Sequence, residues 1–461
     1  MAGRSAFTVY GFGFMRQAGS GDTTGPLART AGTGSRPPVA PRKQTRTFEA
    51  LQYRDYRRLF IAGLFIFLAV QAQQVVRGWL AAELTGSNKG LGGVFFGFAI
   101  PALLFSPVGG VAADRFPKRT VLVVSTSLLV GSALWIGLAD AFGVLEYWML
   151  IGAAAIQAAS FATYGPARIS MTSDLVGRDV LPNAIILSQI SMNSTRILGP
   201  AVGGALIGVH AVGTAGTYLI TAGLMFVALL YAFSLPRTPA TVRPDRPGPV
   251  AELTEGIRYV RRNRPVMYLM ITAYMVMMSA LPYVAFLPTL ATDLFDVGSV
   301  GFGAMNAVSG VAAVAVSLRI AGRTGDPWRT QLLGGLAFGA GVILLGLAPS
   351  FWVALLTLLL VGGAASAFQA MNNTLILTES EPSYHGRVQS LLMLSFSGFG
   401  MAALPLGTLA DSIGLRPVLV GMGTVAVLTM VVYQAVRTRW KARTADGSVG
   451  VDETVGAGTL S

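Results

Sequence analysis

Twelve long apolar segments, separated by short polar loops, constrain this chain of 461 residues more than any other feature. Each is close to the length of about 20 residues at which an α-helix crosses a lipid bilayer. Charged residues make up only 12% of the chain, about half the share of a soluble protein. The sequence therefore predicts an all-α integral membrane protein with twelve transmembrane helices. The predicted spans are 59–85, 91–112, 120–140, 147–171, 184–209, 213–235, 266–291, 299–321, 330–349, 351–378, 387–410 and 416–436.

The spans fall into two groups of six with a polar stretch between them. The halves resemble each other at an offset near 205 residues, since Gly199-Pro200 in span five corresponds to Leu404-Pro405 in span eleven. Many secondary transporters are built from such a duplicated unit, with the substrate site between the halves. We therefore predict two pseudo-symmetric six-helix bundles. The predicted parts are a disordered tail 1–47, an N-terminal bundle 48–235, a linker 236–265, a C-terminal bundle 266–437 and a disordered tail 438–461.

The positive charges predict how the chain is oriented in the membrane. Of the 34 lysines and arginines, 30 fall in the tails and in alternate loops, including the linker and the segment around Arg168 and Arg178. Loops rich in lysine and arginine remain in the cytoplasm. We expect a multi-pass protein of the cell membrane with both termini and the linker in the cytoplasm. The segment 48–58 mixes aromatic and charged residues and predicts an amphipathic helix at the membrane surface.

Several function classes are excluded by the residues that the chain lacks. It contains no cysteine and only two histidines, His210 and His385, far apart in the sequence. Thiolate or histidine-rich metal sites are therefore not expected. The chain has no phosphate-binding loop and no catalytic constellation, so we predict neither an enzyme nor a cofactor. The net charge of +13 is spread over loops and does not form the single basic face that nucleic acid requires.

The loop between spans two and three carries a specific motif, GGVAADRFPKR, over Gly109 to Arg119. Its small residues let another helix approach closely, an aspartate can accept hydrogen bonds from a facing helix N-terminus, and basic residues hold the loop in the cytoplasm. The motif resembles the loop 2–3 signature of the major facilitator superfamily, although Pro117 stands where the family usually has glycine. The matching residues are Gly110, Asp114, Arg115, Lys118 and Arg119.

A second motif lies in span five, where TRILGPAVGG contains Gly199, Pro200, Gly203 and Gly204. It resembles the span-five motif of the superfamily's antiporters. Proline bends a helix in mid-span, and the glycines would permit close packing with span eight. The segments 164–184 and 386–394 are similar to the branch that includes enterobactin exporters and transmembrane secretion effectors. The resemblance covers about residues 48–437.

This resemblance implies alternating access and export driven by an ion gradient, usually protons. We predict a monomeric, proton-driven exporter of an amphipathic small molecule such as a drug, a siderophore or a secondary metabolite. Import of a small polar solute is the alternative within transport, and a non-transporting membrane scaffold or sensor is the alternative outside it. The arginine that many drug–proton antiporters carry in span four is replaced by Ala154, so its coupling role cannot be transferred.

Polar residues within the apolar spans are the candidates for substrate binding or coupling, because an ionisable group at membrane depth is costly. Arg77 lies near the outer boundary of span one, where it would either face the cavity or extend to the headgroups. Each neutral candidate would either line a cavity or bond a neighbouring helix. The candidates are Arg77, Gln74, Gln157, Asn193, Arg196, Gln369 and Asn372.

The end of span eleven superficially repeats the loop 2–3 pattern with Gly407, Asp411 and Gly414. The predicted topology places these residues on the outer face, opposite to the loop 2–3 motif. We therefore expect them to form a helix end and a turn with no role in coupling.

Overall fold

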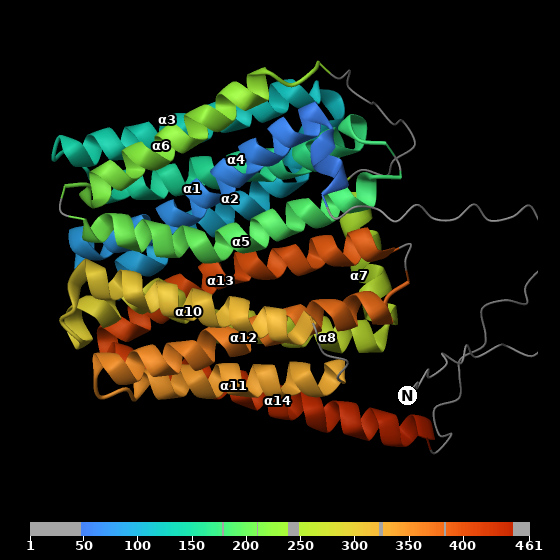
Figure 1. Ribbon diagram of the computed structural model, residues 1–461. Coiled ribbons are helices and arrows are strands. Elements are labelled where there is room, and N and C mark those ends of the chain that lie inside the picture. The colour runs from blue at the N-terminus through green and yellow to red at the C-terminus, as the bar shows by residue number, and fades with distance from the viewer. Residues whose placement is uncertain are drawn as a thin grey trace, which may run out of the picture. The chain divides into compact units, whose positions relative to one another are not determined.

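The computed structural model describes residues 48–177, 179–209, 211–237, 249–321, 326–381 and 384–445, and these residues fold into helices joined by short loops (Figure 1). The α-helices are α1 Arg54–Thr85, α2 Asn88–Arg115, α3 Lys118–Ala141, α4 Tyr147–Leu175, α5 Leu181–Gly208, α6 Gly213–Phe233, α7 Pro249–Arg262, α8 Arg264–Ser279, α9 Leu287–Thr289, α10 Gly298–Ala321, α11 Pro327–Gly346, α12 Phe351–Glu379, α13 His385–Ile413 and α14 Leu415–Ala445. Three short elements, η1 Glu49–Gln52, η2 Leu281–Phe286 and η3 Leu290–Leu294, complete the fold.

The helices confirm the prediction of an all-α membrane protein. Over the described residues, nine helical segments are long and apolar enough to cross a bilayer. The helices α4, α5 and α13 coincide with three further predicted spans but are not among these nine. The count of twelve spans therefore stays a prediction.

Packing between the helices connects the two halves of the sequence along two seams. Within the first half, α1 packs against α5 and α6, and α4 packs against α2 and α3. Within the second half, α11 packs against α12 and α14, and α10 packs against α12. Between the halves, α2 packs along α13 and α5 packs along α10, as Figure 1 shows for the second pair. We call these two contacts the α2–α13 seam and the α5–α10 seam. The division into two bundles remains a proposal, because one hydrophobic core runs through both halves.

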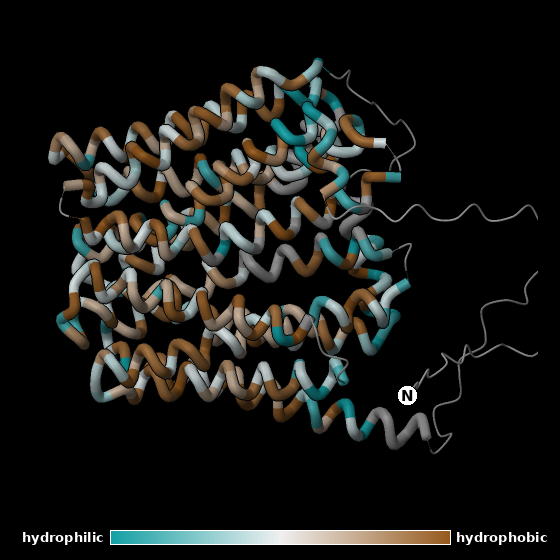
Figure 2. Tube along the Cα trace, viewed as in Figure 1, coloured by the Kyte–Doolittle hydropathy of each residue, from teal (hydrophilic) through white to brown (hydrophobic). Residues whose placement is uncertain are grey.

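The surface of the helices is apolar where lipid is expected. Large side chains such as Leu104, Trp352 and Leu356 are exposed on α2 and α12, which would be unfavourable over so wide an area in water. Figure 2 shows hydrophobic residues along the helices and hydrophilic residues toward their ends. This distribution follows from the bilayer, which solvates apolar side chains and excludes charged ones.

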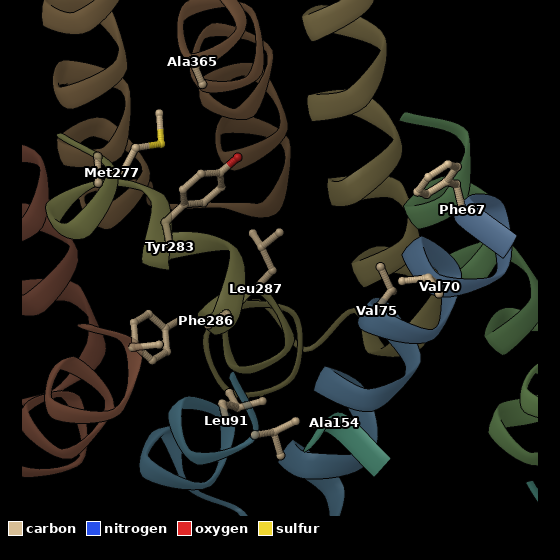
Figure 3. Packing of buried hydrophobic residues seen from close by; sticks show 14 of the residues in the cluster. Phe67, Val70, Val75, Leu91, Ala154, Met277, Tyr283, Phe286, Leu287 and Ala365 are labelled. Atoms are coloured by element: carbon tan, nitrogen blue, oxygen red, sulfur yellow. The ribbon is translucent and has the colours of Figure 1, made fainter. Parts of the chain in front are cut away.

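Span seven is broken rather than continuous. The sequence predicts one helix over 266–291, whereas α8 ends at Ser279 and gives way to a 3₁₀ turn (η2), a short α-helical turn (α9) and a π-helical turn (η3). Pro282 and Pro288 lie in this stretch, and proline removes the backbone donor that a regular helix needs. Figure 3 shows Tyr283, Phe286 and Leu287 projecting from it in different directions.

The predicted surface helix at the start of the chain is wrong in its placement. A 3₁₀ turn, η1, ends before Tyr53, and α1 then runs without interruption from Arg54 into the first span. Tyr56 is buried, and its hydroxyl donates a hydrogen bond of 2.7 Å to the carbonyl of Ala184 in α5. The face that we assigned to the membrane surface packs instead against a neighbouring helix.

The sequence ELTEGIRYVRR predicts a helical piece within the linker, which α7 confirms, whereas the C-terminal tail is more helical than predicted. Within the linker, α7 packs against α13, where Glu255 and Arg387 form an ion pair of 3.1 Å. The helix α14 continues to Ala445, into the stretch predicted to be disordered. The predicted tail 1–47 and residues 446–461 lie outside the described residues.

Candidate functional site

A network of buried polar side chains connects three helices of the first half. The Arg77 guanidinium in α1 donates a hydrogen bond of 2.7 Å to Oε1 of Gln157 in α4. The Gln157 amide donates to Oε1 of Gln73 at 3.1 Å, and the Gln73 amide donates to the hydroxyl of Thr221 in α6 at 3.0 Å. Each donor therefore meets an acceptor on a different helix, so the network holds α1, α4 and α6 in one register.

Arg77 is a buried cation whose hydrogen-bond acceptor, Gln157, is neutral. Its exposed fraction is 3%, and its Nε atom has no hydrogen-bond partner. None of the ion pairs between described residues includes Arg77. The side chain thus points into the interior of the first half and does not extend to the headgroups. A buried cation without a countercharge is costly, and it gives this region a positive potential that an anionic group would reduce.

A second buried arginine lies at the other end of α4. Arg168 is 5% exposed, and its guanidinium carbon lies 5.0 Å from the ring centre of Phe67 in α1. Gly63 makes room for it, since a Cβ atom there would lie 2.8 Å from the Arg168 Nε. We counted Arg168 among the loop charges although it falls within the predicted span 147–171, and the structure places it inside α4. The stack on an aromatic ring partly replaces the water that the guanidinium loses.

The candidates of the second half are only partly brought together. Asn372 in α12 is buried and accepts a hydrogen bond of 2.8 Å from the amide of Gln331 in α11. Gln369 is half-buried on α12. Asn372 therefore bonds a neighbouring helix of its own half, which is one of the two alternatives that the sequence left open.

Arg196 differs from Arg77 because it is exposed although it lies in the middle of α5. At about 100° per residue, it lies on the same side of the helix as Gly203, and Leu198 lies on the opposite side. Gly203 faces α1, whereas Leu198 is exposed in the way expected of a lipid-facing residue. Arg196 therefore lies on the side of α5 that faces the protein. Gln74 is half-buried, and the side chain of Asn193 lies outside the described residues.

The glycines of the span-five motif lie where α5 touches two different helices. A Cβ atom on Gly204 would lie 2.4 Å from the Cα of Gly303 in α10, so the two backbones are in contact. Gly199 and Gly203 instead face Gln71 and Ala72 of α1, with hypothetical Cβ contacts of 2.3 Å and 2.7 Å. Pro200 lies inside the helix between these contacts. Only Gly204 thus packs against span eight, and the other two glycines pack against span one.

The basic residues of the loop 2–3 motif bind within the first half. Lys118 is buried at the start of α3, and its ammonium group donates to Asp174 of α4 at 2.5 Å. Arg119 donates to the carbonyl of Phe233 at the end of α6. Cations stabilise the carboxyl end of a helix, so these residues join the ends of α3, α4 and α6. Pro117 is the N-cap residue just before α3, with a φ of −53°, which suits proline.

The surroundings of Gly110 and the side chain of Asp114 lie outside the described part of the structure, although α2 extends past both. We predict that Asp114→Asn lowers the initial transport rate roughly two- to fivefold, the range expected when a carboxylate loses its interaction with a helix N-terminus. Membrane expression should not change. Asp179→Asn, which neutralises an exposed carboxylate in the loop after α4, is the control. Wild-type transport by Asp114→Asn in a vesicle assay would contradict a role in conformational change.

Sequence reasoning missed Gln73, Thr221, Gln331 and Arg168, which all belong to these buried contacts. A signal for Gln73 was present, because it lies four residues before Arg77 and therefore on the same helix face. Gln74, which we selected instead, is half-buried and is not among the hydrogen bonds of this network. Thr221 and Gln331 carried no signal, since a single polar residue in an apolar helix is also compatible with a local backbone bond.

Comparison with known proteins relates the chain to membrane transporters. The family model described as transmembrane secretion effector matches residues 45–452. The staphyloferrin A transporter of Staphylococcus aureus is 24% identical, over 85% of this chain and 98% of its own. Macrolide efflux protein A of Streptococcus pyogenes is 22% identical, over 76% of this chain and 88% of its own. The enterobactin exporter EntS of Shigella boydii is 26% identical, over 62% of this chain and 68% of its own.

Solved structures resemble the fold at low sequence identity. A bacterial homologue of the human lysosomal transporter Spinster, in an inward-facing and unoccupied conformation, superposes with a TM-score of 0.66 at 16% identity. The match covers 82% of this chain and 95% of the other. The described helices therefore share the fold of that structure.

Proposed function

Because this chain belongs to the transmembrane secretion effector family of the major facilitator superfamily, we propose that it exports amphipathic small organic molecules by alternating access, driven by protons. Its substrates would be drugs, siderophores or secondary metabolites. We place it in the cell membrane as a monomer, with both termini in the cytoplasm. Relatives that are named for macrolide efflux and enterobactin export support the direction of transport.

The observation that carries this proposal is the pair of seams between the halves. Gly92 of α2 approaches the carbonyl of Ala403 in α13 so closely that a Cβ atom would lie 2.3 Å away, and Gly204 meets Gly303 in the same manner. The residues in contact lie near the start of α2 and α10 and near the end of α5 and α13. The predicted topology places all four ends on the outside. Backbone contacts without intervening side chains allow the two halves to close tightly against each other at this end.

The buried charges support binding or coupling within the first half. Arg77 provides a positive potential in a region of low dielectric constant, where an electrostatic interaction is stronger than in water. Arg196 is exposed on the protein-facing side of α5, where a cation is tolerated only if water or a partner is present. The position of Arg77 favours a substrate or an intermediate state that carries negative charge.

Efflux from intact cells tests the proposal. Cells that express the chain are loaded with ethidium, with a macrolide or with a catecholate siderophore, and retention is measured with and without a proton uncoupler. We expect lower retention than in cells without the chain, and we expect the uncoupler to abolish the difference. Expression is matched by quantifying the protein in the membrane fraction.

The outcomes separate the parts of the proposal. Export that continues in the presence of the uncoupler would exclude proton coupling. Higher retention than in control cells would favour the importer. If cells with and without the chain retain every compound in the panel equally, the proposed substrate class would be contradicted.

A further inference from the structure

Asp411, near the end of α13, binds the first residues of α2 from the other half of the chain. Its Oδ1 accepts the backbone N–H of Asn88 at 2.7 Å and the side-chain amide of Asn88 at 3.0 Å. Its Oδ2 accepts the backbone N–H of Lys89 at 2.9 Å. The expectation that this end of span eleven forms only a turn is therefore wrong, since the carboxylate caps a helix more than 300 residues away in the sequence.

The physical basis of this contact is the free N-terminus of α2. The first N–H groups of a helix have no partner inside it, and the helix dipole adds a partial positive charge at the same end. One carboxylate here occupies two of these N–H groups, one with each oxygen. Hydrogen bonds to an ionised acceptor are stronger than those between neutral groups.

Asp411 ends a row of contacts along the seam between α2 and α13. A Cβ atom on Gly407 would lie 2.2 Å from the carbonyl of Asn88, and one on Gly400 would lie 2.5 Å from the carbonyl of Phe95. Ala403 faces the backbone of Gly92 between them. As the residue number rises along α13 it falls along α2, so the two helices are antiparallel.

This antiparallel arrangement relates Asp411 to the loop 2–3 motif. Each helix carries a glycine followed four residues later by an aspartate at its carboxyl end, Gly110 and Asp114 in α2 and Gly407 and Asp411 in α13. The two patterns therefore lie at opposite ends of one seam. Asp411 stabilises closure at its end of the seam, because separation there requires its hydrogen bonds to α2 to break.

We propose that Asp411 is the latch that holds the outer end of the transporter closed, as the counterpart of Asp114 at the inner end. This proposal rests on alternating access as proposed above. Loss of the latch shifts the population toward the outward-open state, because only the closed state contains the three hydrogen bonds. Asp411 is thus a positioning residue that acts through α2 and not on the substrate.

A labelling experiment tests the latch without any substrate. The chain contains no cysteine, so Ala403→Cys introduces a single thiol at a fully buried seam position. We expect Asp411→Asn and Asp411→Ala to raise its rate of labelling by a membrane-impermeant maleimide in intact cells about tenfold, the factor expected for the loss of a helix cap. Asp114→Asn should lower that rate.

Two controls distinguish opening from unfolding. Asp293→Asn removes another exposed carboxylate near the predicted outer end of span seven, and it should leave the labelling unchanged. A thiol placed by Ala139→Cys, buried near the end of α3 and away from the seam, should remain unlabelled in the Asp411 variants. Equal labelling at position 403 with and without Asp411 would overturn the proposal, and so would increased labelling at both positions.

A reversible crosslink tests whether the contact must open during transport. We expect the variant Asn88→Cys with Asp411→Cys to lose efflux of the panel compound that the unmodified chain exports, roughly tenfold or more on oxidation, because a closed gate stops turnover, and to recover on reduction. The control is Ser125→Cys with Thr163→Cys, which joins α3 to α4 inside one half at an Oγ–Oγ distance of 2.7 Å. Efflux by the reduced variant tests the proposed function separately. Undiminished efflux by the oxidised, crosslinked Asn88–Asp411 pair would overturn the latch.

Discussion

Replacing Arg77 with lysine or with glutamine is expected to reduce the initial rate of transport by roughly tenfold or more while the protein still inserts into the membrane. Arg77 donates to Gln157 at 2.7 Å and is 3% exposed. Removing one partner of a charged, buried hydrogen bond costs about 1.5–3 kcal/mol. Lysine keeps the charge but loses the planar fork of donors, so we expect it to fail as well.

The measurement is efflux together with thermal unfolding of the purified protein in detergent. A residue that only supports packing would lower both in proportion, whereas a residue needed for coupling or binding lowers transport beyond the loss of stability. Arg261→Gln, at an exposed position of α7, is the matched control and should transport at the wild-type rate. Full activity of Arg77→Lys would mean that a long cationic side chain is sufficient, and full activity of both variants would remove Arg77 from the site.

A second substitution separates charge from geometry at the same contact. Gln157→Glu would give the Arg77 guanidinium a carboxylate partner at nearly the same position. If the uncompensated charge matters only for stability, this variant should unfold at a higher temperature and transport normally. If transport depends on that charge, the variant should be stable and slow, because the carboxylate would neutralise the positive potential.

The sequence was sufficient to predict where the helices lie along the chain but not which face of each helix contacts a neighbour. The lengths of the apolar segments predicted the spans, because every helix that crosses the bilayer needs about the same apolar length. The pair Arg77 and Gln157 lies 80 residues apart, and both residues were selected without being paired. Which face of a helix meets which neighbour depends on packing between helices, and one sequence shows only the polarity of each position.

Errors in the prediction arose where a local pattern had a distant partner. Arg168 was counted among the loop charges that set the predicted orientation, but it lies inside α4, where Phe67 and Gly63 of α1 accommodate it. Asp411 was interpreted as part of a turn because its partner, the start of α2, is far away in the sequence. Pro282 and Pro288 indicate the break in span seven, but the span was predicted from its count of apolar residues, which does not depend on proline.

Gly204→Val is expected to abolish transport, because it places a side chain where α5 and α10 are in backbone contact. A Cβ atom on Gly204 would lie 2.4 Å from the Cα of Gly303, and one on Gly303 would lie 2.9 Å from the carbonyl carbon of Gly204. Overpacking of this kind costs about 1–3 kcal/mol. Since the contact joins the two halves, we expect the helices to separate there while each half keeps its own packing.

The expected result of Gly204→Val is a protein that reaches the membrane in normal amounts and transports at about one tenth of the wild-type rate or less, because about 1–3 kcal/mol changes the ratio of two states roughly five- to 150-fold. Labelling of the thiol at position 403 should rise at the same time, because the α2–α13 seam and the α5–α10 seam both close the predicted outer end. Gly223→Val is the control, since a Cβ atom on that glycine of α6 would meet no other atom within 4 Å. Wild-type transport by Gly204→Val would show that closure of this seam is not part of the transport cycle. Loss of transport without increased labelling would show that the glycine contact is needed for some step other than closure of the outer end.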